Sequence, residues 1–197
     1  VPAALIGVPA MLILKQPDLG TTLLLVATGG AVVFLAGLSW KVILPGAVAG
    51  LAAGIGFFSY GLEDYQRQRI MTMFNPDSDP LGAGYQILQS KIALGSGGFT
   101  GKGFMEGTQS QLDYLPEKQT DFIFTILGEE FGFVGGLVIL TIYALILANT
   151  VAIATSCKST FLRLTTMGVA TTFGLYVFIN VGMVMGVLPV VGVPLPM

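Results

Sequence analysis

The sequence contains no histidine and only one cysteine, Cys157, among its 197 residues. These absences exclude acid–base catalysis by histidine, zinc sites built from cysteine and histidine, and a disulfide bond within the chain. Carboxylate, lysine, arginine, tyrosine and hydroxyl side chains are therefore the groups left for chemistry.

Charged residues are also scarce. They make up 10% of the chain, against roughly 25% in an ordinary soluble domain. Hydrophobic residues make up 53%, and the mean hydropathy is +0.81. A soluble fold cannot bury that much apolar surface, so a bilayer must solvate part of it. The net charge of −2 gives no sign of a nucleic-acid partner.

The two ends of the chain lie in apolar sequence. The chain starts at Val1, without methionine, and stops at Met197 after a proline-rich stretch. No signal-peptide pattern is visible, because the start has neither a basic segment nor a small-residue cleavage site. We interpret the chain as an internal fragment of a longer protein.

Five apolar segments predict an all-α, polytopic helical bundle, since lipid offers no hydrogen-bond partner to a free backbone group. They are residues 1–14 (the end of a span), 20–38, 42–62, 122–153 and 164–186. Segment 20–38 has no charge and would extend roughly 28 Å as a helix, close to the ~30 Å hydrocarbon core. Its adjacent glycines, Gly29 and Gly30, predict close packing against another helix.

A polar region, residues 63–121, separates the third and fourth segments. Long ordered loops are usually functional, and residues 85–94 within this one predict a short amphipathic helix lying in the membrane surface. Thirteen of the twenty charges fall in the region: Glu63, Asp64, Arg67, Arg69, Asp77, Asp79, Lys91, Lys102, Glu106, Asp113, Glu117, Lys118 and Asp121. We therefore expect membrane helices over 1–62, a large extracytoplasmic loop over 63–121, and membrane helices with the start of a following loop over 122–197.

The charges indicate the orientation only weakly. The short loops opposite the polar region carry Lys41, Lys158 and Arg163 and no acid. The density of basic residues therefore predicts that these loops are cytoplasmic. The raw number of basic residues, of which the polar region has five, predicts the reverse.

Asp121 lies where the polar region becomes an apolar helix. The positive end of that helix would keep the carboxylate ionised, able to accept a proton or hold a cation. The alternative is that Asp121 only caps the helix. Asp18, in the charged turn Lys15–Gly20, is interpreted as a helix cap or as a contact to a substrate, and these two roles are compatible with each other.

Other polar residues allow similar pairs of interpretations. Arg67 and Arg69 could clamp a diphosphate or simply extend to the membrane interface. Glu129 and Glu130 fall inside an apolar segment, where ionisable groups usually face a wet cavity or a partner. Helix geometry lets at most one of them face the same cavity as Asp121, and we expect a structural role for Glu130.

Two further features receive simpler interpretations. The stretch GSGGFTGKG (95–103) fails the phosphate-loop pattern, because Ser96 replaces its first glycine and Gly103 its serine or threonine. Nucleotide binding is therefore rejected, and a flexible backbone near a lipid headgroup is the interpretation left. Asn180, inside the last apolar segment, predicts a hydrogen bond between helices.

Five stretches together resemble the SEDS family of bacterial shape, elongation, division and sporulation proteins, over nearly the whole chain. GTQSQ (107–111) is more similar to the RodA branch of that family than to the FtsW branch. The stretches are KQPDLGT (15–21), DYQRQR (64–69), NPDSDPLGAGYQILQSKIALGSGG (75–98), GKGFMEGTQSQLDYLPEKQTDFIF (101–124) and NVGMVMGVLPVVGVPLP (180–196).

The resemblance implies a fragment of a ten-helix fold in the bacterial inner membrane, with residues 63–121 on the periplasmic face. The tenth helix and the serine–glycine motif after the final proline pair are absent here. The resemblance also implies a peptidoglycan glycosyltransferase that polymerises lipid II, the undecaprenyl-linked disaccharide-pentapeptide, during elongation and rod-shape maintenance. The implied partners are a class B penicillin-binding protein and other membrane proteins of the elongation complex.

The resemblance places the catalytic base at Asp121 and the membrane-edge aspartate of the family at Asp18. The expected substrate-binding residues are Asp18, Lys15, Arg67, Arg69, Gln109, Glu117 and Lys118. No cofactor is certain, and a Mg²⁺ or Mn²⁺ ion near Asp121 is the one candidate. Gln119 departs from the family pattern, where many relatives carry histidine, so a histidine there is not needed for activity.

Two rival functions use the same location. A lipid II flippase would need polar groups facing a membrane cavity near mid-bilayer in several helices. The uncharged spans before the polar region argue against it. A scaffold that only positions a penicillin-binding protein would produce no polymer when purified.

Overall fold

The computed structural model describes residues 1–16, 18–39, 41–42, 44–46, 71–72, 75, 79, 82–108 and 120–197. Within these residues the long elements are all helices, as expected for a chain that must satisfy its backbone within lipid. They are α1 (Pro2–Leu14), α2 (Leu19–Leu35), α5 (Ala83–Gly97), α7 (Ile123–Ser156) and α8 (Thr160–Val184).

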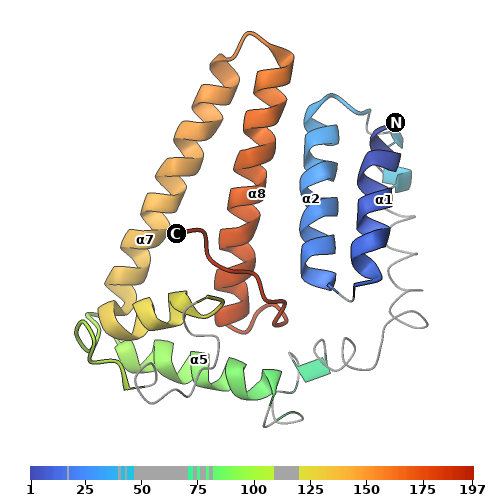
Figure 1. Ribbon diagram of the computed structural model, residues 1–197. Helices are drawn as coiled ribbons and strands as arrows, with labels where there is room; N and C mark the ends of the chain where they lie inside the picture. The colour runs from blue at the N-terminus through green and yellow to red at the C-terminus, as the bar shows by residue number, and fades with distance from the viewer. Residues whose placement is uncertain are drawn as a thin grey trace.

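Four of these helices run up and down, and the fifth lies across their ends (Figure 1). Helix α1 packs on α2, α2 on α8, and α8 on α7, while α5 crosses the end at which α7 begins and α8 ends. The α1–α2 turn lies at that same end, which we call the α5 end. The α7–α8 connection and the end of α2 lie at the opposite end. The amphipathic helix predicted over 85–94 is confirmed as α5, with three more residues at its C-terminal end and two at its N-terminal end.

Most of the predicted apolar segments are confirmed as helices, with shifted ends. Helix α2 stops at Leu35 rather than 38, because Gly37 takes a φ of 93° and donates its N–H to the carbonyl of Phe34, a usual glycine-terminated helix end. Helix α8 begins at Thr160, so Arg163 lies inside a helix and not in a loop. The span predicted over 42–62 lies mostly outside the described residues.

The helices α7 and α8 are long and apolar enough to cross a membrane. Many apolar side chains of α7 face outwards, among them Leu137, Val138, Leu145 and Ile153. So large an apolar surface on single helices is what a bilayer would cover. The sequence of α7 reads as one helix, but its backbone leaves the helical region at Gly132. As a result, the first part of α7 lies beside α5 and the rest rises as the span (Figure 1).

After α8 the chain turns back and runs in irregular conformation among the helices (Figure 1). Val190, Val193 and Leu195 of this C-terminal segment (185–197) are buried. The Tyr143 hydroxyl of α7 donates to the carbonyl of Pro196 at 2.9 Å. These buried side chains join two clusters with residues of the helices. The first contains Ile87, Phe122, Phe124, Tyr143, Val177, Met183, Val184, Val190 and Leu195, and the second contains Leu24, Ile179 and Val193.

Candidate active site

Asp18 is the N-cap of α2. Its carboxylate accepts hydrogen bonds from the Thr21 N–H at 3.0 Å and from the Thr21 hydroxyl at 2.6 Å. The capping interpretation is therefore confirmed, and the side chain stays exposed. Lys15 ends α1 in the same turn and is also exposed. An exposed capping carboxylate held in one orientation can still contact a ligand.

Asp121 lies immediately before the N-cap of helix α7, which is Phe122. The two interpretations of its carboxylate, as a helix cap and as a group that accepts a proton or holds a cation, both stay predictions. The Asp121 side chain is half-buried, so its carboxylate is neither a solvated surface charge nor sealed inside the protein.

The C-terminal segment passes close both to the start of α2 and to Asp121. A β-carbon on Gly20, two residues after Asp18, would lie 2.7 Å from the carbonyl oxygen of Val191. A β-carbon on Gly192 would lie 3.5 Å from Oδ2 of Asp121. Two neighbouring residues of the C-terminal segment, Val191 and Gly192, therefore approach the start of α2 and Asp121, respectively, at the α5 end.

Asn180 fixes this arrangement from within α8. Its side chain is fully buried, and its amide nitrogen donates to the Asp121 carbonyl at 2.7 Å and to the Val193 carbonyl at 2.8 Å. We predicted that Asn180 bonds between helices. It bonds instead to two non-helical stretches, because these are the ones whose carbonyls lack a helical partner. Sequence patterns miss this role, since both partners are backbone groups.

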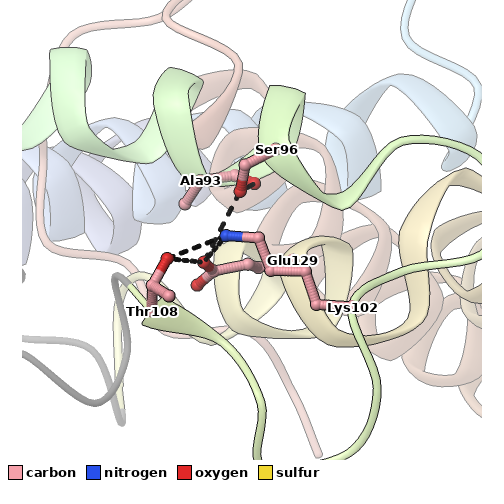
Figure 2. Close-up of polar contacts among 5 residues, drawn as sticks. All are labelled: Ala93, Ser96, Lys102, Thr108 and Glu129. Atoms are coloured by element: carbon pink, nitrogen blue, oxygen red, sulfur yellow. Dashed lines mark hydrogen bonds and ion pairs between the residues drawn. The ribbon is translucent and has the colours of Figure 1, made fainter.

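Glu129 has its partner in the glycine-rich stretch. Oε1 of its buried carboxylate lies 2.7 Å from Nζ of Lys102 (Figure 2). Thr108 joins the pair: its hydroxyl accepts from Nζ at 2.8 Å and lies 3.2 Å from the same carboxylate oxygen. Glu130 is nearly buried as well. A paired Glu129 agrees with the expectation for ionisable groups in apolar segments.

Five of the expected substrate-binding residues lie outside the described part of the chain: Arg67, Arg69, Gln109, Glu117 and Lys118. The described residues thus bring together Asp18, Lys15 and Asp121 at one end. Within the described ranges, no group of three or more acidic or cysteine side chains that could hold a metal ion is found. A cation there would need further oxygen donors, such as the phosphates of a substrate.

The family model described as cell cycle protein FtsW, RodA and SpoVE matches residues 1–197. The chain belongs to the FtsW/RodA/SpoVE family. This confirms the predicted resemblance, since SEDS is the collective name of these proteins. The fold is that of a fragment of a larger helical membrane protein of this family.

A curated relative of this FtsW/RodA/SpoVE chain is named as an enzyme of peptidoglycan synthesis. The chain is 53% identical over 194 residues to the peptidoglycan glycosyltransferase MrdB of Escherichia coli K12, and the alignment covers 98% of this chain and 52% of that protein. The chain therefore spans about half the length of this curated relative.

Two solved structures share the fold of this FtsW/RodA/SpoVE chain. A chain from a study of how a peptidoglycan synthase complex coordinates polymerization and crosslinking matches with a TM-score of 0.78 and 33% identity, over 100% of this chain and 54% of that one. The crystal structure of an aspartate-to-alanine mutant of the rod shape determining protein RodA of Thermus thermophilus matches with a TM-score of 0.61 and 29% identity, over 99% and 47%.

Proposed function

We propose that the full-length protein is a peptidoglycan glycosyltransferase that polymerises lipid II at the outer face of a bacterial inner membrane. The observation that carries the proposal is the half-buried carboxylate of Asp121, which approaches the C-terminal segment two residues before α7. The names of the relatives supply the reaction class.

The reaction needs a base that deprotonates the acceptor, an attack on the donor sugar, and departure of a charged leaving group. The acceptor sugar hydroxyl loses its proton as its oxygen attacks the anomeric carbon of the donor, and the lipid diphosphate leaves. An α-linked donor that becomes a β-linked product undergoes a single inverting displacement, so no enzyme nucleophile is required. Asp121 takes the proton, and a general base of this kind typically contributes 10²–10⁴-fold.

Basic residues would neutralise the leaving diphosphate, as guanidinium and ammonium groups do at phosphates. Arg67, Arg69 and Lys118 are the candidates in the polar region, and Lys15 lies in the turn that carries Asp18. A Mg²⁺ or Mn²⁺ ion held by Asp121 and the diphosphate would serve the same purpose. Glu117 and Gln109 complete the proposed contacts to the sugars.

Replacing Asp121 with asparagine tests the proposal. The Asp121→Asn change keeps the size and polarity of the side chain but removes the base, so glycan polymerisation by the purified full-length protein should fall at least about 100-fold. The matched control is Glu106→Gln, which neutralises an exposed carboxylate of the same polar region and should leave the rate unchanged. An unchanged rate in Asp121→Asn would remove Asp121 as the base.

The same assay separates the rival functions. A flippase would move labelled lipid II across vesicles without making polymer, and a scaffold would do neither. In the described parts of α7 and α8 the ionisable side chains besides Tyr143 and Tyr176 are Glu129, Glu130 and Arg163. None of these three lies near the middle of a span, which favours chemistry at the membrane edge over passage through it.

We also propose a class B penicillin-binding protein and other membrane proteins of the elongation complex as partners. The solved neighbour comes from work on coordinated polymerization and crosslinking in a synthase complex, and the outward apolar surface of α7 is available for another membrane helix. Co-purification of the full-length protein with such a partner from detergent extracts tests the assignment.

A further inference from the structure

Helix α7 changes direction at Gly132. This residue has φ 66° and ψ −163°, a backbone conformation that glycine adopts almost alone. The part before it, Ile123–Phe131, begins two residues after Asp121 and lies across the α5 end, whereas the part after it forms the span (Figure 1). The direction of Ile123–Phe131 therefore decides where Asp121 lies.

The glycine-rich loop 98–103 inserts its backbone into this break. In an unbroken helix the N–H groups of Phe133 and Val134 would bond to the carbonyls of Glu129 and Glu130. Here the loop supplies a substitute partner for each of the four groups. The bonds are Phe133 N–H to Gly98 carbonyl at 2.9 Å, Val134 N–H to Phe99 carbonyl at 3.1 Å, Lys102 N–H to Glu129 carbonyl at 3.1 Å, and Gly103 N–H to Glu130 carbonyl at 3.0 Å.

The approach to α7 requires glycine at two positions. A β-carbon on Gly97 would overlap the carbonyl of Gly128, and one on Gly101 would overlap the carbonyl of Glu130. Gly95, in the same stretch, has nothing within 4 Å of such an atom. The backbone of the loop is therefore held against α7, and its expected location near a lipid headgroup stays a prediction.

An ion pair closes the insertion. The Glu129 side chain is 1% exposed and that of Lys102 27%, and their charged atoms are 2.7 Å apart. Ser96 lies 3.5 Å from the same carboxylate oxygen, so loop, α5 and α7 meet there (Figure 2). A carboxylate this buried is unstable without a partner, so Glu129 and Lys102 hold each other in place.

We infer that Lys102 and Glu129 are positioning residues for glycan polymerisation. Together with loop 98–103 they form a clamp that sets the direction of Ile123–Phe131 and so the location of the Asp121 carboxylate. They do not touch the substrate in this role, and they act through Asp121. The inference rests on the proposed function of Asp121.

The test uses full-length protein carrying Lys102→Met, Glu129→Gln or both changes, with Lys102→Arg as the conservative variant. Misplacement of a catalytic group by about 1 Å can lower a rate about 100-fold, so kcat for lipid II should fall about 10- to 100-fold in Lys102→Met while KM stays within about twofold. Lys102→Arg should restore kcat, and Lys91→Met, which removes an exposed lysine of α5, should leave it unchanged. An unchanged kcat in both Lys102→Met and Glu129→Gln would overturn the inference.

The double variant, Lys102→Met with Glu129→Gln, shows whether a lowered kcat comes from unfolding, because it leaves no unpaired buried charge that would destabilise the protein. It should melt at the temperature of the unchanged protein and still have a lowered kcat. Recovery of full kcat in a stable double variant would also overturn the inference, since the clamp would then matter only for stability.

A distance measurement separates this inference from the proposed function. Spin labels at Thr120→Cys and Ser159→Cys, on a background in which the other cysteines are removed, report how the start of α7 lies relative to the far end of the span. The distance distribution should be narrow in the unchanged protein and should broaden or shift in Lys102→Met. If Asp121→Asn is fully active but the distribution still shifts, the clamp stands and the role of Asp121 falls; an unshifted distribution overturns the clamp.

Discussion

At the scale of single residues, Asn180 connects parts of the chain that sequence patterns treat separately. It sits on α8, yet its amide holds the backbone of Asp121 and of Val193 at 2.7 and 2.8 Å. These two hydrogen bonds between neutral groups hold both backbone stretches in place, because breaking either bond leaves a carbonyl without a partner. A buried amide is therefore the second anchor of Asp121, beside the clamp.

We predict that Asn180→Leu lowers both stability and rate. Loss of the two donors should reduce the free energy of unfolding by about 1–3 kcal/mol and polymerisation at least about tenfold, because Asp121 is no longer held. Thermal melts and the lipid II assay measure the two effects. Asn149→Leu is the control, since that exposed amide bonds to Leu145 of its own helix and should alter neither. Normal polymerisation by Asn180→Leu would show that this anchor is dispensable.

At the scale of helices, the contact between α1 and α2 depends on one glycine of a pair. A β-carbon on Gly29 would lie 2.7 Å from Cδ1 of Ile6, whereas one on Gly30 would have nothing within 4 Å. The sequence predicted that this pair packs closely. The structure assigns the contact to Gly29 alone, because only that position faces α1.

Substituting each glycine separately tests this assignment. Gly29→Leu should separate α1 from α2 and lower the free energy of unfolding by about 1–3 kcal/mol, the usual effect of overpacking. Gly30→Leu should leave stability nearly unchanged, because its side chain would enter open space. Thermal unfolding of both variants in the same detergent gives the comparison. Equal melting temperatures would mean that the two helices do not meet at Gly29.

At the scale of the whole molecule, the two ends of the bundle differ. The α1–α2 turn, α5 and the start of α7 share one end, while the α7–α8 connection, with Cys157 and Lys158, lies at the other (Figure 1). The proposed reaction consumes an exported lipid, so it requires the α5 end to face outwards. The density of basic residues in the short loops favours the same orientation.

Cysteine labelling in spheroplasts tests the orientation. On a cysteine-free background that includes Cys157→Ser, a membrane-impermeant maleimide should label Thr120→Cys but not Lys158→Cys. Both positions are exposed, so both should react after the membrane is disrupted. The reverse pattern would put Asp121 on the cytoplasmic side, where the polymerisation proposal fails.

The sequence by itself determined the class of the protein, the helices and the family. Long apolar segments without charge predict membrane helices, because a helix satisfies its backbone hydrogen bonds within the segment, and α1, α2, α7 and α8 agree with that prediction. Long composite motifs around residues 15–21 and 101–124 identified the family. Such signals are local, so they survive without knowledge of any neighbour.

Tertiary structure alone decided the break in α7, the clamp and the return of the C-terminal segment. Gly132 sits in an apolar run that reads as continuous helix, and its conformation depends on a loop some thirty residues earlier that supplies the missing backbone bonds. Gly20, two residues after Asp18, approaches Val191, and Asp121 approaches the next residue, Gly192, because the C-terminal segment returns to the α5 end. These outcomes depend on hydrogen bonds and close approaches between distant residues, and no periodicity or spacing along the chain encodes which distant groups will meet.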